Sequence, residues 1–249
     1  MNTEKNRLGQ NVGRPMPDWA GCSVPPRATM EGVLCRLVPL DPTTHAESLY
    51  LANSLDTDGR MWTYLPYGPF VDLAAYRQML DKAAVSSDTL FLTIIDKATM
   101  RALGLAAYLR IDPGMGSIEV GHLSFSPLLQ RRPVATEAMF LMMRTAFELG
   151  YRRYEWKCNA LNEPSRRAAV RLGFQFEGIF RQAAVYKQRN RDTAWYSIID
   201  SEWPALSAAF GAWLAPDNFD SSGVQRTSLS DLTAALVAHN NYTQQKAGD

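Results

Sequence analysis

The segment 125–138, FSPLLQRRPVATEA, has the residue types and spacing best suited to chemistry. A strand-like end, a turn carrying Arg131 and Arg132, and a helix start follow one another directly. The first N–H groups of a helix have no intrahelical acceptor and lie at its positive end, so such a start binds phosphate oxygens. Taken alone, the segment favours equally an anion-binding turn and an ordinary helix start with two solvated arginines.

Hydrophobic periodicity and turn residues predict the elements that must position this turn. Their expected order is βααβββαβαββ, over residues 33–40, 42–55, 73–83, 90–95, 103–111, 118–125, 134–149, 154–158, 163–172, 174–186 and 194–199. Asp41 and Asp72 are expected to cap the first two helices, and the aromatic, proline-rich segment 61–70 to form a stiff loop between them. The pattern predicts an α/β (α+β) domain.

The two ends of the chain differ in pattern from its middle. Residues 1–30 are rich in proline and glycine and predict an irregular arm. We expect one domain over 31–203, followed by an extension over 204–249 with an amphipathic helix at 202–214 and a loose polar tail from Asn240. The extension helix has two possible uses, since it suits either the domain's own core or a second subunit.

Composition excludes several classes of protein. The 249 residues are 46% apolar and 20% charged, as in ordinary globular proteins, and the formal net charge is +1. We therefore expect no nucleic-acid or membrane partner. Three cysteines without C-x-x-C spacing, and a start without an apolar stretch, favour a cytoplasmic protein with neither a disulfide framework nor a bound metal.

Two motifs carry a family resemblance. Gln130 and Ala135 stand at the first and last positions of a Q/R-x-x-G-x-G/A pattern. Asn162 and Ser165, followed by RLGF at 171–174, form an N-x-x-S…L-G-F pattern. With the order of elements, these motifs resemble the GNAT superfamily of N-acetyltransferases over residues 33–203.

A further segment narrows the resemblance. EGIFR at 177–181, followed by Arg191 and Asp192, is similar to the branch that acetylates ribosomal-protein amino termini and assorted small amines. The resemblance implies the GNAT fold, with a mixed central sheet and two splayed parallel strands. It also implies acetyl-CoA as co-substrate and an amine as acceptor.

The resemblance also implies the cofactor contacts. The turn after Gln130 would hold the diphosphate, Asn162 would orient the pantetheine arm, and the backbone of Leu123, Ser124 and Phe125 would pair with that arm. Pro133 stands where the family usually has glycine, and it has no N–H to donate. The remaining expected donors are the N–H groups of Arg131, Arg132, Val134, Ala135 and Thr136.

Acetyl transfer to an amine requires that the amine be neutral. An α-amine, with a pKa of ~7.7 to 8.0, needs little help, whereas a lysine-like amine at ~10.4 needs a base. Glu119 lies 11 positions before Gln130, a spacing at which some GNAT enzymes carry that base, and Glu155 on the next strand is the second candidate. The alternative is that either carboxylate is paired with a neighbouring arginine.

The departing thiolate requires a proton or a hydrogen bond. Many relatives carry a tyrosine seven residues after the motif asparagine, and here that position is Ala169. By resemblance to the ribosomal-protein branch, Ser165 would bond the sulfur, and its alternative role is a helix cap.

Aromatic residues between the first two helices are the candidate acceptor contacts. Trp62, Tyr64 and Tyr67 are expected to wall the acceptor site, with a core or interface role as the alternative. His122 is expected to be structural.

We therefore expect an acetyl-CoA-dependent N-acetyltransferase that acts by direct attack in a ternary complex. Its acceptor would be a protein amino terminus or a small-molecule amine. The alternative, suggested by Pro133 and Ala169, is a non-catalytic CoA-binding or interaction protein that keeps the fold. A homodimer is left open.

Overall fold

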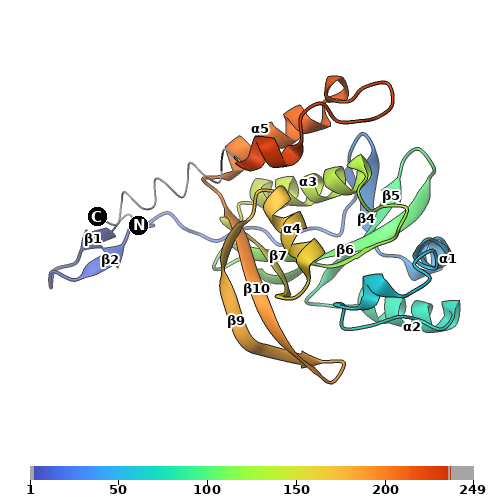
Figure 1. Ribbon diagram of the computed structural model, residues 1–249. Coiled ribbons are helices and arrows are strands. Elements are labelled where there is room, and N and C mark those ends of the chain that lie inside the picture. The colour runs from blue at the N-terminus through green and yellow to red at the C-terminus, as the bar shows by residue number, and fades with distance from the viewer. Residues whose placement is uncertain (1–2, 235, 237–249) are drawn as a thin grey trace.

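An eight-stranded mixed sheet forms the centre of the computed structural model, which describes residues 3–234 and 236 (Figure 1). The strand order is β3-β4-β5-β6-β7-β8-β10-β9, and every neighbouring pair is antiparallel except the parallel pair β7–β8. The strands are β3 Met30–Glu31, β4 Cys35–Pro39, β5 Leu90–Asp96, β6 Arg101–Asp112, β7 Ser117–Phe125, β8 Arg153–Asn159, β9 Gln175–Tyr186 and β10 Arg189–Ile199.

Helices follow the strands in the expected sequence. They are α1 Pro42–Asn53, α2 Leu73–Ala84, α3 Pro133–Glu148, α4 Glu163–Arg171 and α5 Trp203–Leu214, with 3-10 turns at Arg60–Trp62 and Pro216–Asn218. From β4 to β10 the order is βααβββαβαββ, which confirms the predicted arrangement. Asp41 and Asp72 cap α1 and α2 by accepting from backbone N–H groups in the first turn, also as predicted.

The strands alternate between two cores, one on each face of the sheet. In β5, Phe91 and Ile95 pack with α1 and α2, whereas Leu92 and Ile94 belong to the cluster that includes α3. This period of two explains why both faces of the central strands are apolar. The helices α1 and α2 thus lie on one side of the sheet and α3 on the other (Figure 1).

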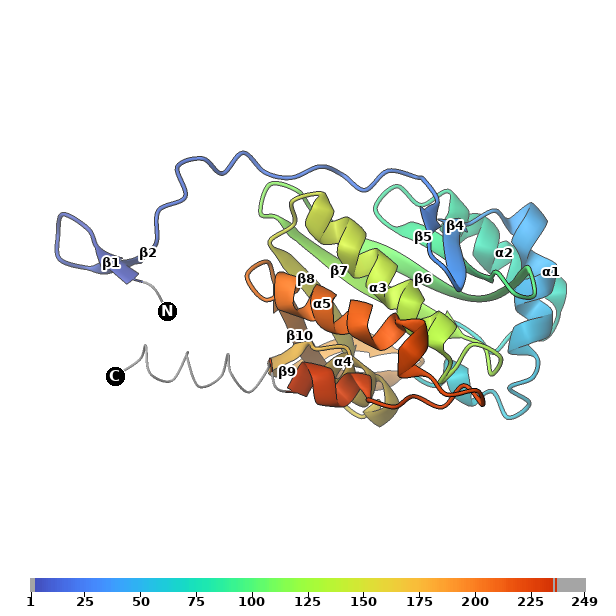
Figure 2. The same cartoon turned by 90° about the horizontal axis from the view of Figure 1, so that it is seen from above.

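The amino-terminal arm departs from the prediction. Its first residues form a two-stranded hairpin, β1 Thr3–Lys5 with β2 Asn11–Gly13. Asn6 accepts two backbone N–H groups in the turn, which closes the hairpin locally. Because β2 is exposed throughout, no alternation of apolar residues marks it in the sequence. The arm then runs along the domain to β4, as Figure 2 shows, and Trp19 donates to the Gly114 carbonyl at 2.8 Å.

The helix α5 packs on its own domain. Phe147 stacks on Trp203 and Phe140 on Phe210, so α5 packs alongside α3 (Figure 2). Of the two expected uses of this helix, the structure has the intramolecular one. The polar tail expected from Asn240 lies outside the described residues.

Candidate active site

The parallel strands β7 and β8 separate partway along their length. Within the described residues, their register ends at Val120 and Trp156. Beyond this point β7 stays paired with β6 as far as Phe125, and β8 with β10 as far as Asn159. An irregularity in β7 bends it away, and His122 there has a φ of +51°. The expected splay is therefore present, and it leaves backbone polar groups facing the gap with no ladder partner.

The expected cofactor residues of β7 lie in this diverging stretch. Ser124 is buried, and its hydroxyl has no hydrogen-bond partner within the described structure. Leu123 packs against the core on the α3 side. The Phe125 carbonyl, however, accepts from Nε2 of Gln130 at 2.7 Å, because the turn after β7 brings Gln130 back over the strand end. These two expected cofactor contacts are already engaged with each other.

The turn before α3 holds fewer free donors than the sequence suggested. Arg131 has a φ of +60°, Arg132 is the N-cap without a side-chain cap, and Pro133 is the first helical residue. The N–H of Ala135 donates to the Arg132 carbonyl at 3.0 Å. No intramolecular acceptor is recorded, within the part of the chain described, for the N–H groups of Arg131 and Val134. These two donors remain for a ligand.

The two arginines of the turn differ in their engagement. The Arg132 guanidinium lies 3.5 Å from the Leu128 carbonyl and 3.9 Å from Asp96 Oδ2, so it leans toward β5. Its backbone N–H reaches the Leu129 carbonyl at 3.4 Å. Arg131 is exposed and has no recorded ion pair within the described residues. Of the pair, Arg131 is the one whose charge the protein leaves uncompensated.

A third arginine joins this region from α4. Nη1 of Arg171 donates to the hydroxyl of Thr136 at 3.1 Å, and its guanidinium lies 5.2 Å from the centre of the Trp213 ring. Burial lowers the pKa of Arg171. The side chain of Thr136 is thus buried against this arginine rather than open to a ligand. The sequence places Arg171 in the RLGF motif but predicts no role for it, because its approach to α3 depends on packing between helices.

Glu119 and Glu155 lie opposite each other just before the splay. They are register partners on β7 and β8. Nζ of Lys157 lies between them, 3.0 Å from Glu119 and 2.7 Å from Glu155. Arg110 bonds Glu119 at 2.6 Å, and Arg153 bonds Glu155 at 2.7 Å. The arginine pairing that the sequence left as the alternative is present for both carboxylates.

The two carboxylates differ in proton affinity. Burial raises the pKa of Glu119, and the charges of Lys157 and Arg110 oppose that rise without cancelling it. Burial also acts to raise the pKa of Glu155, but hydrogen bonds and charges from Lys157 and Arg153 together outweigh it, so that pKa is lowered. Glu119 is therefore the carboxylate that changes protonation closer to neutral pH.

Lys157 is the residue of this group that sequence reasoning missed. Its side chain is 6% exposed, and Nζ lies 3.6 Å from the centre of the Trp195 ring. A lysine on a strand normally faces solvent. Only the register that sets Glu119 opposite Glu155 makes a buried cation favourable here, and no local pattern reports that register.

The start of α4 follows directly after β8. Asn162 is the N-cap, and its Oδ1 accepts from the Ser165 N–H at 3.2 Å. The capping role considered for Ser165 therefore belongs to Asn162, whose amide nitrogen remains a donor. Oγ of Ser165 accepts from Nε1 of Trp156 at 3.1 Å, so its own proton is available to a sulfur acceptor, and the Cys158 thiol lies within its hydrogen-bond reach. Ala169 is fully buried and supplies no acid.

The aromatic loop between α1 and α2 reaches over to the far side of the splay. The Tyr64 hydroxyl donates to the Leu161 carbonyl at 3.0 Å, and Nζ of Lys187 donates to the Trp62 carbonyl at 2.7 Å. Trp62 itself is 5% exposed and packs in the core of the loop. Of the three expected acceptor contacts, Trp62 thus acts through packing, whereas Tyr64 lies at the surface.

Tyr67 and His122 join the loop to β7. Their rings stack at 5.7 Å with an interplanar angle of 4°, and Nδ1 of His122 lies 3.3 Å from the Tyr67 hydroxyl. Burial lowers the pKa of His122, with a further decrease from Arg110. These contacts hold the ring of His122 between the loop and β7, and its structural role stays a prediction.

Within residues 3–234 and 236, no helix is both long and apolar enough to cross a bilayer. The same part of the chain contains no cluster of three or more side chains suited to hold a metal ion.

Comparisons with known proteins agree with this geometry. Residues 35–175 match the family model described as acetyltransferase (GNAT) domain. A GCN5-related N-acetyltransferase from Brucella melitensis is 49% identical, with a TM-score of 0.86 over 88% of this chain and 100% of its own. A probable GNAT-family acetyltransferase from Chromobacterium violaceum is 43% identical, with a TM-score of 0.73 over 78% of this chain and 97% of its own. The uncharacterized N-acetyltransferase p20 of Bacillus licheniformis is 26% identical over 59% of this chain and 84% of its own.

Proposed function

The chain belongs to the GNAT family of N-acetyltransferases, and from this premise we propose that it transfers the acetyl group of acetyl-CoA to a primary amine. The acceptor is a protein amino terminus or a small-molecule amine. The amine attacks the thioester directly while both substrates are bound.

The splay of β7 and β8 is the observation that carries this proposal. The gap opens beyond Val120 and Trp156, and the turn with the free N–H groups of Arg131 and Val134 follows directly after β7. An extended arm between the strands would place a diphosphate at these donors, where Arg131 adds charge. The loss of a donor at Pro133, about 1 kcal/mol, is smaller than one charged contact at ~1.5 to 3 kcal/mol.

Glu119 is the base in this proposal. Its raised pKa suits proton removal from an ammonium through a water molecule. Lys157 and Arg110 hold the carboxylate in place and accommodate the change in its charge. Glu155, with its lowered pKa, stays ionised and anchors Lys157.

Ser165 stabilises the leaving thiolate. Trp156 orients its oxygen by donating to it, and the hydroxyl proton is then directed to the sulfur. A thiol with a pKa near ~8.5 needs only modest stabilisation to leave. The amide nitrogen of Asn162 binds the pantetheine arm.

Further parts of the proposal concern the setting of the enzyme. We place the catalytic unit at 31–203, with 1–30 as an arm and 204–249 as an extension. The cysteines Cys22, Cys35 and Cys158 are unpaired, which suits the cytoplasm. The likeness to the ribosomal-protein branch over 177–181 favours α-amines as acceptors. Whether the enzyme forms a homodimer is tested by sedimentation.

A thiol-trapping assay across a panel of amines tests the function. CoA release that requires both acetyl-CoA and an amine is expected, with peptides bearing free amino termini compared against the same peptides blocked at the terminus. Silence with every acceptor, together with tight acetyl-CoA binding by calorimetry, would favour instead a CoA-binding protein without turnover. Ala169 in place of an acid is the observation that keeps this second candidate.

A further inference from the structure

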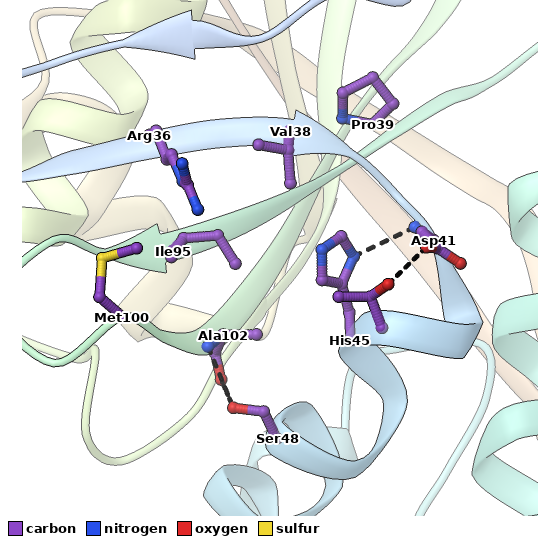
Figure 3. A pocket seen from close by; sticks show the side chains of 10 residues that line it. Arg36, Val38, Pro39, Asp41, His45, Ser48, Ile95, Met100 and Ala102 are labelled. Atoms are coloured by element: carbon purple, nitrogen blue, oxygen red, sulfur yellow. Dashed lines mark hydrogen bonds between the residues drawn. The ribbon is translucent and has the colours of Figure 1, made fainter.

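A cavity of about 360 Å³ lies beside the first turn of α1 (Figure 3). Its walls come from α1 and from the adjoining strands β4, β5 and β6. In the sheet, β5 and β6 separate β4 from β7, so the cavity is distinct from the splay where acetyl transfer is proposed.

His45 presents a single hydrogen-bond donor to this cavity. The residue is 8% exposed, and its Nδ1 accepts from the Asp41 N–H at 3.1 Å and lies 3.1 Å from Oγ1 of Thr93. Because Nδ1 is an acceptor, the proton of the neutral ring resides on Nε2. In Figure 3 this second nitrogen points away from Asp41, toward Ile95, and no partner is recorded for it in the described residues.

Arg36 supplies the charge on the same side. It lines the cavity from β4, and its Nε is buried without a hydrogen-bond partner. No ion pair of Arg36 is recorded in the part of the chain described. The neighbouring carboxylate of Asp41 instead accepts from the Thr43 N–H and the Thr44 hydroxyl, which commits it to the cap of α1. The buried Nε–H of Arg36 therefore lacks a hydrogen-bond acceptor within the described residues.

The rest of the cavity wall is mixed, because the side chains of Asp41 and Thr44 line it together with apolar residues. Val38, Ile95 and Met100 line it, and the Ser48 hydroxyl is already bonded to the backbone of Ala102. A molecule that satisfies Arg36 and His45 therefore finds apolar contacts for its body at Val38, Ile95 and Met100.

We propose that this cavity binds a small monocarboxylate with a short aliphatic or aromatic body. The carboxylate accepts from the Arg36 guanidinium and from Nε2 of His45, while the body lies against Val38, Ile95 and Met100. Guanidinium–carboxylate pairing is charge-assisted and geometrically specific, which makes the carboxylate rather than the apolar body decisive.

The test is a titration of the full chain with isobutyrate, followed by NMR of the histidine side chains and by calorimetry. Saturable binding is expected, with the Nε2 resonance of His45 shifted and those of the other histidines unchanged. Isobutyramide, which has the same shape without the charge, is expected to bind at least about tenfold more weakly. Equal binding of the amide, or no saturable binding of isobutyrate, would overturn the proposal.

Variants and a competitor locate the site. Arg36→Met keeps an unbranched stem and is expected to weaken isobutyrate binding about tenfold or more, whereas Arg77→Met, at an exposed position of α2, leaves it unchanged. If Arg36→Met does not fold, the wild-type His45 shift decides alone. Isobutyrate binding is expected to persist in saturating CoA, and displacement by CoA would assign the probe to the acetyl-transfer site and overturn the proposal.

Discussion

The proposed active site has two regions that are built in opposite ways. One is the charged cluster of Glu119, Lys157 and Glu155, and the other is the turn from Gln130 to Val134. In the cluster each charge already has an opposite charge within 3.0 Å. In the turn, two backbone donors and the Arg131 guanidinium have no protein partner in the described structure. In the proposed mechanism a ligand completes the turn, whereas the cluster is already complete and acts by exchanging a proton. Substitutions in the turn should change the binding of acetyl-CoA, and those in the cluster should change turnover.

The largest effect is expected from Glu119→Gln, which removes the base and keeps the shape of the side chain. We expect kcat to fall about 10²-fold with acetyl-CoA binding nearly unchanged. The carboxylate acts when ionised and burial raises its pKa, so kcat/KM of the wild type falls as pH decreases through that raised pKa. A pH–rate profile of the variant should lack this acidic limb.

The matched control is Glu155→Gln, at the register partner of Glu119. Because the pKa of Glu155 is lowered, this carboxylate stays ionised over the pH range of the assay. The pH–rate profile of Glu155→Gln should therefore keep the acidic limb at the same pH as in the wild type. If the two variants lose equal activity, the cluster works as one structural unit and Glu119 is not its base.

A smaller effect is expected in the turn. Arg131→Ala should raise KM for acetyl-CoA about tenfold and leave kcat unchanged, since a charged contact to phosphate is lost in both ground and transition states. Arg132→Ala should raise it less, because that guanidinium already lies near Leu128 and Asp96. Steady-state kinetics of both variants, with Arg77→Ala as control, measure this. An unchanged KM in the double variant would remove the arginines from the site.

Ser165 belongs neither to the charged cluster nor to the turn, and its substitution should slow only the departure of the thiolate. Ser165→Ala is expected to lower kcat about fivefold to tenfold with KM for acetyl-CoA unchanged, because one hydrogen bond to the departing sulfur is lost. The loss also leaves Nε1 of Trp156 without its acceptor, so a melting curve of the variant separates instability from slow chemistry. Wild-type turnover in the variant would mean that water protonates the thiolate.

The smallest effect is expected at the loop that reaches across the splay. Tyr64→Phe removes the hydrogen bond to the Leu161 carbonyl and should raise KM for the amine about threefold, with KM for acetyl-CoA unchanged. Kinetics with each substrate varied in turn measure this. A change in the acetyl-CoA constant instead would place the loop on the cofactor side.

Local signals account for what the sequence predicted. Asp72 before an apolar stripe predicted the start of α2, and alternating residues predicted β5 to β7, because caps and periodicity act over a few residues. The hairpin near Asn6 was missed because β2 is exposed along its whole length and so carries no apolar alternation.

Non-local contacts account for what the sequence did not predict. The burial of Lys157 depends on the register between β7 and β8, and the approach of Arg171 to Thr136 depends on the packing of α4 against α3. The bond between Gln130 and the Phe125 carbonyl depends on the fold of a turn whose residues equally suit a solvated side chain. The type of chemistry could thus be predicted from the sequence, whereas the hydrogen-bond and ion-pair partners of each side chain could not.

A crystal structure with bound CoA tests the central claim most directly. The account predicts the diphosphate at the N–H groups of Arg131 and Val134, the arm between β7 and β8 beyond Val120 and Trp156, and the sulfur near Ser165. Density for CoA elsewhere on the molecule, with the two strands paired to their ends, would contradict it.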